Sequence, residues 1–140
     1  MFIDASIIVA ILAQEPGWER LVSRLGDPST PKFTSPIAKF EAVISVTRAG
    51  AERSGLRPTA RDMEIVEAAV IDIMRDFGIA EMPIDSTTGE GAVAASKRYG
   101  KVVGHRARLN LGDCFAYACA KSLNVPLLYK GDDFALTDLA

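Results

Sequence analysis

The sequence predicts an α/β fold in which a parallel β-sheet carries helices on both of its faces. Short apolar segments alternate with longer amphipathic ones, in the order strand, helices, strand, helices, strand, two helices and strand. No repeat, low-complexity tract or linker interrupts this order, so we expect residues 1–140 to form a single domain. Hydrophobic residues make up 49% of the chain and charged residues 24%, which is typical of a protein with a substantial core.

Turn and capping residues delimit the elements of the first half of the chain. They predict a strand over residues 1–3, helices over 6–14 and 18–25, a strand over 32–34, and helices over 36–49 and 58–77. Asp4 or Ser6 caps the first helix. Ser35 and Pro36 provide the cap and the first residue of the third helix, which we expect to stop at Gly50.

The second half of the chain predicts two further strands and a pair of helices. The strands cover residues 79–84 and 125–129, and the helices cover 86–99 and 112–123. Ser86 or Thr87 caps the first of these helices, and Gly100 ends it. Residues 101–110 are basic and irregular, and residues 132–137 form a turn or a short helix.

Composition argues against several classes of protein. No run of about 18 apolar residues is present, as a membrane helix would need. The short apolar run after Asp4 lacks the basic start of a signal peptide, so we expect a cytoplasmic protein. Cys114 and Cys119 point away from each other on one helix, and His105 is the only histidine. We therefore expect buried, inert thiols, and neither a disulfide nor a zinc site.

Aspartates follow the first and the last predicted strand. Asp4 ends the first strand, and Asp132 and Asp133 come after the last one. Ligands of open α/β sheets bind beyond the carboxyl ends of the strands, so these positions can lie at one edge of the sheet. Each also has a plainer interpretation, because Asp4 suits a helix cap and Asp132-Asp133 suits a polar turn.

Two further acids lie on predicted helices. Glu41 falls within the apolar face of the helix over 36–49, whose members are Ile37, Phe40 and Ile44, with Thr47 as a further candidate. A carboxylate there is costly unless it is paired, hydrogen-bonded or metal-bound, or reaches water from the edge of the face. Asp113 opens an apolar helix, where the helix dipole alone favours an acid by about 0.3–1 kcal/mol.

The four acid positions converge if the strands end at one edge, and no histidine, cysteine or lysine is among them. Several ionised carboxylates share a small space only when a cation neutralises them. Hard oxygen ligands select Mg²⁺ or Mn²⁺ over zinc or copper, and Mg²⁺ needs only one or two direct carboxylates. The remaining acids then orient the waters of the ion, one of which becomes the nucleophile toward a phosphate.

A basic stretch precedes Asp113. The net charge of the chain is −2, yet the residues between Glu90 and Asp113 include no acid and five cations: Lys97, Arg98, Lys101, Arg106 and Arg108. A local positive stretch attracts phosphates even on a mildly acidic protein. The alternative interpretation is a solvated helix end and loop.

Four segments, taken in order and spacing, resemble those of the PIN domain, and more narrowly those of the VapC-type ribonuclease toxins of bacterial toxin–antitoxin modules. They are MFIDAS at the start, residues 35–46 with Glu41, LNLGDCFAY over 109–117, and PLLYKGDDF over 126–134. The resemblance spans nearly the whole chain. It implies a three-layer α/β/α fold of PIN type with a central parallel sheet. It also implies cleavage of RNA with Mg²⁺, for which Mn²⁺ can substitute, leaving a 3′-hydroxyl and a 5′-phosphate.

The resemblance also assigns roles to individual residues. Asp4 and Asp113 match the acids that usually bind metal, and Glu41 matches a third catalytic acid. Ser6 matches a small hydroxyl residue that holds a water or the phosphate of the substrate.

The fourth catalytic acid is where this chain departs from the family pattern. Many relatives carry it two residues before the Asp-Phe pair, where this chain has Gly131. The role then falls to Asp133 or Asp132. We favour Asp133 because it is the residue paired with Phe134.

The resemblance implies three kinds of partner. The first is an RNA substrate, for which Arg106 and Arg108 are the expected contacts in the basic stretch. The second is a cognate antitoxin, a segment of which covers the acidic groove, often with an arginine reaching in. The third is a second copy of the chain, because these toxins commonly form homodimers.

Three other functions fit parts of the pattern. A haloacid-dehalogenase-like phosphatase also uses an aspartate after its first strand, but it needs a second acid two residues later, where this chain has Ser6. A phosphoacceptor receiver domain needs an acid pair after the first strand and a nucleophilic aspartate at the end of a middle strand. A non-catalytic binding module on the same fold is the third alternative, although all four acid positions are filled.

Overall fold

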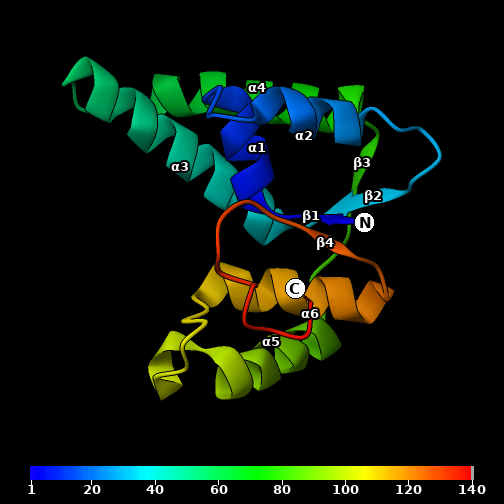
Figure 1. Ribbon diagram of the computed structural model, residues 1–140. Helices are drawn as coiled ribbons and strands as arrows, with labels where there is room; N and C mark the ends of the chain where they lie inside the picture. Colours follow the sequence, from blue (N-terminus) through cyan, green and yellow to red (C-terminus); the bar gives the residue numbers. More distant parts are fainter. Residues whose placement is uncertain (140) are drawn as a thin grey trace.

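The computed structural model describes residues 1–139 and has three layers, with a parallel sheet between two layers of helices (Figure 1). The strands are β1 (Phe2–Ile3), β2 (Lys32–Thr34), β3 (Ile79–Glu81) and β4 (Leu127–Leu128), in the order β3-β2-β1-β4. All three pairings are parallel, as predicted. β1 and β4 are neighbours although they come from opposite ends of the chain, so the segments that follow them emerge at the same edge of the sheet.

The helices divide into two layers. One face of the sheet carries α1 (Ala5–Leu12), α2 (Trp18–Leu25), α3 (Pro36–Ser54) and α4 (Ala60–Asp76), as can be followed in Figure 1. The other face carries α5 (Ser86–Tyr99) and α6 (Leu111–Leu123), which are joined through a short 3₁₀ helix, η1 (Lys101–Val103). The fold class predicted from the alternation of elements is confirmed.

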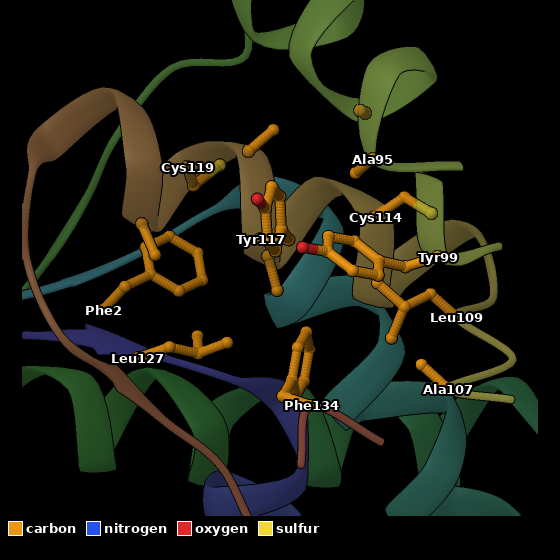
Figure 2. Close-up of a cluster of buried hydrophobic side chains, with 14 residues drawn as sticks. Phe2, Ala95, Tyr99, Ala107, Leu109, Cys114, Tyr117, Cys119, Leu127 and Phe134 are labelled. Atoms are coloured by element: carbon orange, nitrogen blue, oxygen red, sulfur yellow. The ribbon is translucent and has the colours of Figure 1, made fainter. Parts of the chain in front are cut away.

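Successive residues of a strand are buried in two separate hydrophobic cores, because side chains alternate between the two faces of a sheet. Phe2 and Leu127 are buried against α5 and α6, in the cluster of Figure 2. Their neighbours Ile3 and Leu128 are buried on the opposite face, with residues of α1, α3 and α4. Cys114 and Cys119 are both buried and free, which confirms the prediction of unpaired thiols.

Several element ends differ from the sequence prediction, each for a local reason. α3 continues through Gly50 and ends before Gly55, which has the left-handed φ of 68°. An interior glycine costs only about 1 kcal/mol, so the packing of α3 carries the helix past it. β3 stops short of Pro83, which has no N–H for the ladder. The cap of α5 is Asp85, which accepts from Thr88 N at 2.8 Å.

The buried face of α3 is mostly not the predicted one, because Thr47 alone among the predicted residues is buried. Its fully buried residues are Ala38, Ala42, Val43 and Thr47. Phe40 is 63% exposed, and Ile44 is only partly buried. Small side chains let α3 approach the neighbouring helices closely, and the bulky ones are left on its flank. Glu41 therefore borders a cavity instead of interrupting a core face.

Among the helices of residues 1–139, none combines the length and the apolar character that crossing a membrane requires.

Candidate active site

A cavity of about 700 Å³ opens at the carboxyl edge of the sheet, lined by α1, α3, the start of α6 and the segment after β4. Among residues 1–139, five carboxylates line it: Asp4, Glu15, Glu41, Asp113 and Asp133. Glu15 is the one that the sequence analysis did not single out. The structure thus brings together the acids that the sequence singled out. Their charges act on one another, because Asp4 and Asp113 both raise the pKa of Glu41.

Asp4 is held at the junction of β1 and α1. It is the N-cap of α1, and its Oδ2 atom accepts from the backbone N–H of Ser6 at 3.0 Å and from the Ser6 hydroxyl. The residue is only 6% exposed. Burial raises the pKa of the Asp4 carboxyl despite the hydrogen bonds from Ser6, and the charge of Asp133 raises it further.

Ser6 links the two ends of the chain at this site. Its hydroxyl donates to Asp4 and accepts from the backbone N–H of Lys130, the second residue after β4, at 3.0 Å. The hydroxyl of Ser6 therefore holds the segment that follows β4 next to the first carboxylate. The resemblance predicted that this hydroxyl holds a water or the phosphate of the substrate, which stays a prediction; the contacts that the structure shows are with Asp4 and Lys130.

Glu41 projects from α3 toward the start of α6. Burial, followed by the charges of Asp4 and Asp113, raises the pKa of its carboxyl to about 7. The carboxylate rests against the backbone of Gly112, where a β-carbon would overlap both carboxylate oxygens. Only glycine leaves this space free.

Asp113 is fixed by a reciprocal cap at the start of α6. Its Oδ2 atom accepts from Asn110 N at 2.7 Å, and its own N–H donates to Asn110 Oδ1 at 3.1 Å. Burial raises the pKa of the Asp113 carboxyl to about 6, against the effect of the Asn110 hydrogen bond, and Asp133 and Asp4 add to the rise. The sequence analysis explained Asp113 by the helix dipole, and the structure adds this reciprocal cap with Asn110. Asp113 lines the cavity as well.

Asp132 and Asp133 are both exposed, but only Asp133 lines the cavity. Phe134, directly after Asp133, is 1% exposed and reaches into the core shown in Figure 2. Its ring meets that of Tyr129 edge-on, with 5.0 Å between centroids. This buried anchor fixes the direction of the turn that carries Asp133.

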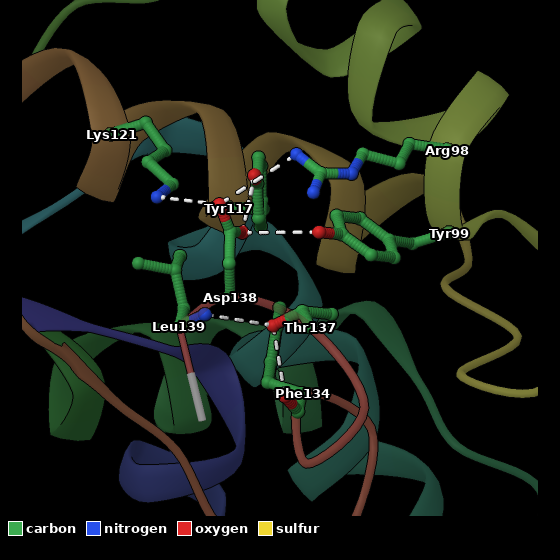
Figure 3. Close-up of polar contacts among 8 residues, drawn as sticks. All are labelled: Arg98, Tyr99, Tyr117, Lys121, Phe134, Thr137, Asp138 and Leu139. Carbon is green, nitrogen blue, oxygen red and sulfur yellow. Dashed lines mark hydrogen bonds and ion pairs between the residues drawn. The ribbon is translucent and has the colours of Figure 1, made fainter.

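A second anchor holds the end of the same segment (Figure 3). The Oδ1 atom of Asp138 accepts from the hydroxyls of Tyr117 at 2.7 Å and Tyr99 at 3.3 Å, and its Oδ2 atom accepts from Lys121 Nζ at 3.0 Å. These donors lower the pKa of the Asp138 carboxyl to about 2, with the bond from Tyr117 the largest cause. The segment after β4 is thus tied to α5 and α6 at Phe134 and Asp138, which both follow Asp133, and to Ser6 of α1 at Lys130, which precedes it.

Two cations in the cavity escaped the sequence analysis. Arg48 lies seven residues after Glu41, so the helical period places both on one face of α3, and that spacing was a signal that could have been read. Lys130 lines the cavity beside Ser6, and its Nζ forms an ion pair with Glu15. Only the pairing of β1 with β4 shows that Lys130 belongs to the site.

The predicted RNA contacts Arg106 and Arg108 do not line the acidic cavity. They line a separate pocket of about 490 Å³ together with Lys101 and His105. The loop is ordered, because Lys101 N donates to Leu109 O at 3.0 Å and the ring of His105 meets that of Tyr99 edge-on. The loop leads directly into α6, as Figure 1 shows, so the basic pocket and the start of α6 are adjacent along the chain.

The donor set of the cavity fits a hard divalent cation. Its charged donors are carboxylates, and the Oδ1 atoms of Asp4 and Asp113 have no side-chain partner within residues 1–139. No side-chain oxygen or nitrogen in that range is both buried and unpartnered, so these atoms are open to solvent. The described residues hold no ready-made cluster of three metal ligands. Mg²⁺ does not need one, because it binds one or two carboxylates and retains its waters.

Comparison with known proteins gives one family. The sequence profile of the PIN domain matches residues 1–139. A VapC ribonuclease of Rhizobium meliloti is 47% identical over 99% of this chain and 98% of its own length. A ribonuclease VapC of Mycolicibacterium smegmatis is 35% identical over 100% of this chain and 98% of its own.

Solved structures share the fold at low sequence identity. The Mycobacterium tuberculosis toxin VapC20, described as cleaving the sarcin–ricin loop, superposes with a TM-score of 0.69 at 15% identity, covering 96% of this chain and 92% of its own. A toxin–antitoxin complex from Klebsiella pneumoniae gives a TM-score of 0.64 at 16% identity, covering 99% of this chain and 92% of the compared one.

Proposed function

Because this chain belongs to the PIN-domain family, in its VapC branch, we propose that it is a toxin that acts as a metal-dependent endoribonuclease. The observation that carries the proposal is the cavity in which Asp4, Glu41, Asp113 and Asp133 meet. The family match also sets aside the phosphatase and the receiver domain as alternatives.

Asp4 and Asp113 are the residues that would hold the cation, Mg²⁺ in the cell with Mn²⁺ as a substitute. Their carboxylates are oriented by the caps of α1 and α6, and each presents a free oxygen to the cavity. When bound, the cation supplies an activated water and offsets the charge that develops on the scissile phosphate.

The other side chains of the cavity complete the reaction. Glu41, whose pKa is about 7, accepts the proton of the attacking water, since a base works best when its pKa lies near ambient pH. Arg48 and Lys130 bind the non-bridging phosphate oxygens. Asp133 orients the water from the opposite end of the chain. Attack on phosphorus breaks the bond to the 3′ oxygen and leaves a 3′-hydroxyl and a 5′-phosphate.

Lys101, Arg106 and Arg108 extend RNA binding beyond the cavity. They line one pocket, and none of them forms an ion pair with an acid of residues 1–139. Unpaired cations on an ordered loop suit the RNA backbone, which carries one charge per nucleotide.

The partners we propose follow the family. An antitoxin segment covers the acidic cavity and places an arginine among its carboxylates, and the toxin itself forms a homodimer. A toxin–antitoxin complex among proteins of the same fold is consistent with the first of these.

Cleavage of RNA by the purified protein tests the proposal. Total RNA is incubated with Mg²⁺, and the new 5′-phosphate ends are sequenced for the native protein and for Asp4→Asn and Asp113→Asn. We expect discrete ends from the native protein and at least a hundredfold fewer from either variant, because each loses a carboxylate that would hold the cation.

Asp132→Asn is the matched control, since Asp132 neighbours the site but does not line the cavity. It should cleave like the native protein. RNA that is bound but uncut by the native protein, with either Mg²⁺ or Mn²⁺, would instead identify a non-catalytic binding module.

A further inference from the structure

Phe40 is an aromatic side chain placed in water at the edge of the acidic cavity. It lies on the second turn of α3, is 63% exposed, and lines the cavity beside Glu41. A single exposed apolar residue is ordinary on a protein surface. The position of this one is not accounted for by the core, because the buried face of α3 consists of other residues.

The cavity has an apolar part besides its charged part. Val9 of α1 and Ile44, one helical turn after Phe40, line it together with the phenyl ring. Charged and apolar side chains thus share a volume of about 700 Å³, within the usual range for sites that hold a small organic group.

We propose that Phe40 is a stacking platform for a nucleobase of the RNA, next to the phosphate that is cut. The proposal rests on the proposed ribonuclease function and deepens it, because it names a residue that selects single-stranded substrate. Bases of unpaired RNA are free to stack on aromatic rings, whereas paired bases are already stacked on each other.

The arrangement of the cavity supports a base over other apolar groups. A nucleotide joins an anionic phosphate to a flat aromatic base through one ribose, so a site for it needs cations and an exposed ring within one hollow. Arg48 supplies a cation without an acidic partner in residues 1–139, whereas the second cation, Lys130, is paired with Glu15 of the same cavity. Phe40 and Ile44 supply the apolar surface on the same helix as Arg48.

The test compares RNA with and without bases. Binding is measured by fluorescence anisotropy for a chain of twelve uridines and for a twelve-residue chain of abasic ribose phosphates. All proteins carry Asp4→Asn so that the RNA is not cut. With Phe40 present we expect the uridine chain to bind about 5- to 100-fold more tightly than the abasic chain. Phe40→Ala should remove most of that preference and leave the affinity for the abasic chain unchanged.

Two further variants make the result specific. Phe40→Trp should keep or increase the preference for bases, because the larger ring also stacks. Leu56→Ala, at an apolar residue that is 72% exposed and outside both the cavity and the basic loop, should leave the preference unchanged.

Each other outcome overturns the inference. Equal weakening of both RNA chains by Phe40→Ala would show a general role in the shape of the cavity. An unchanged preference, together with a shift from dimer to monomer in sedimentation, would assign Phe40 to contact between copies of the chain. If the protein that retains Phe40 bound neither RNA chain, the proposed function itself would be contradicted, and this inference would be contradicted with it.

Discussion

The carboxylate of Glu41, on the second turn of α3, lies directly against the backbone of Gly112 in the first turn of α6. A β-carbon at position 112 would overlap both oxygens of Glu41. α3 and α6 are thus in contact at the carboxylate that we propose as the base of the reaction. Gly112, which has no reactive side chain, thus determines the position of the Glu41 carboxylate.

Gly112→Ala should therefore reduce cleavage without harming the fold. The methyl group displaces the flexible end of Glu41, and a misplacement of about 1 Å can cost about a hundredfold in rate. Helix stability should not fall, because alanine is the better helix former. Rates of RNA cleavage and thermal melts of the variant measure both effects.

Gly89→Ala on α5 is the control for Gly112→Ala, because a β-carbon there meets open space. It should retain full activity. If Gly112→Ala were as active as the native protein, the contact between Glu41 and this glycine would not affect the rate of cleavage.

Removal of the charge at position 41 should change how stability depends on pH in the absence of metal. The pKa of Glu41 is raised from 4.5 to about 7, so the folded state is favoured while the group is protonated. That stability is fully present below pH 4.5 and is lost as the pH rises through 7. In EDTA we expect Glu41→Gln to melt at a higher temperature than the native protein at pH 8, with no difference at pH 4.5.

Addition of Mg²⁺ should raise the melting temperature of the native protein at pH 8 more than that of Glu41→Gln. Glu67→Gln removes an exposed acid of α4 outside the cavity and should match the native pH profile. If the melting temperature of Glu41→Gln did not rise above that of the native protein between pH 4.5 and pH 8 in EDTA, the raised pKa of Glu41 would be contradicted.

Ser6→Ala should loosen the contact between the two ends of the chain. Its hydroxyl joins Asp4 to the backbone of Lys130, and loss of the two hydrogen bonds should cost about 1–2 kcal/mol of unfolding free energy. Cleavage should fall at the same time, since both Asp4 and the segment after β4 lose a partner. Urea denaturation and RNA cleavage measure the two losses.

Ser29→Ala is a close match to that change. Ser29 donates to Asp27 from its N–H and its hydroxyl, two residues apart, as Ser6 does to Asp4, but on an exposed loop. It should alter neither activity nor, by more than a few tenths of a kcal/mol, stability. If Ser6→Ala and Ser29→Ala changed stability and cleavage equally, the hydrogen bond from Lys130 N to Ser6 would contribute nothing to either property.

The basic loop should govern the salt dependence of RNA binding. Arg106→Ala with Arg108→Ala should weaken binding and lower the slope of log affinity against log salt by about one for each lost phosphate contact. Arg20→Ala with Arg24→Ala, on α2, removes the same charge elsewhere and should leave the slope unchanged. An identical slope for both double variants would assign the basic loop another role, such as contact with the antitoxin.

Asp138→Asn should release the end of the segment that carries Asp133. The amide keeps the shape of the carboxylate but loses the charge that pairs with Lys121 and attracts the hydroxyls of Tyr99 and Tyr117. We expect faster amide exchange over residues 130–139 and unchanged exchange in α4. Unchanged exchange over residues 130–139 would show that Phe134 alone holds the segment.

Helix caps and turn residues largely determined the elements of this protein, because they act over a few neighbouring residues. Ser35-Pro36 at the start of α3 and the strand at Lys32–Thr34 could be read directly from the sequence. The same is true of Asp113, whose capping partner Asn110 is three residues away. The family motifs added the set of acids, although not their positions in space.

Tertiary structure alone decided which side chains share the cavity. The order β2-β1-β4 brings Lys130 and Asp133 beside Asp4, and no local pattern encodes that order. Packing of α3 through its alanines turned Phe40 outward, where periodicity had placed it in the core. Periodicity reports that a face is apolar, but only the neighbouring helices determine which part of it has room to be buried.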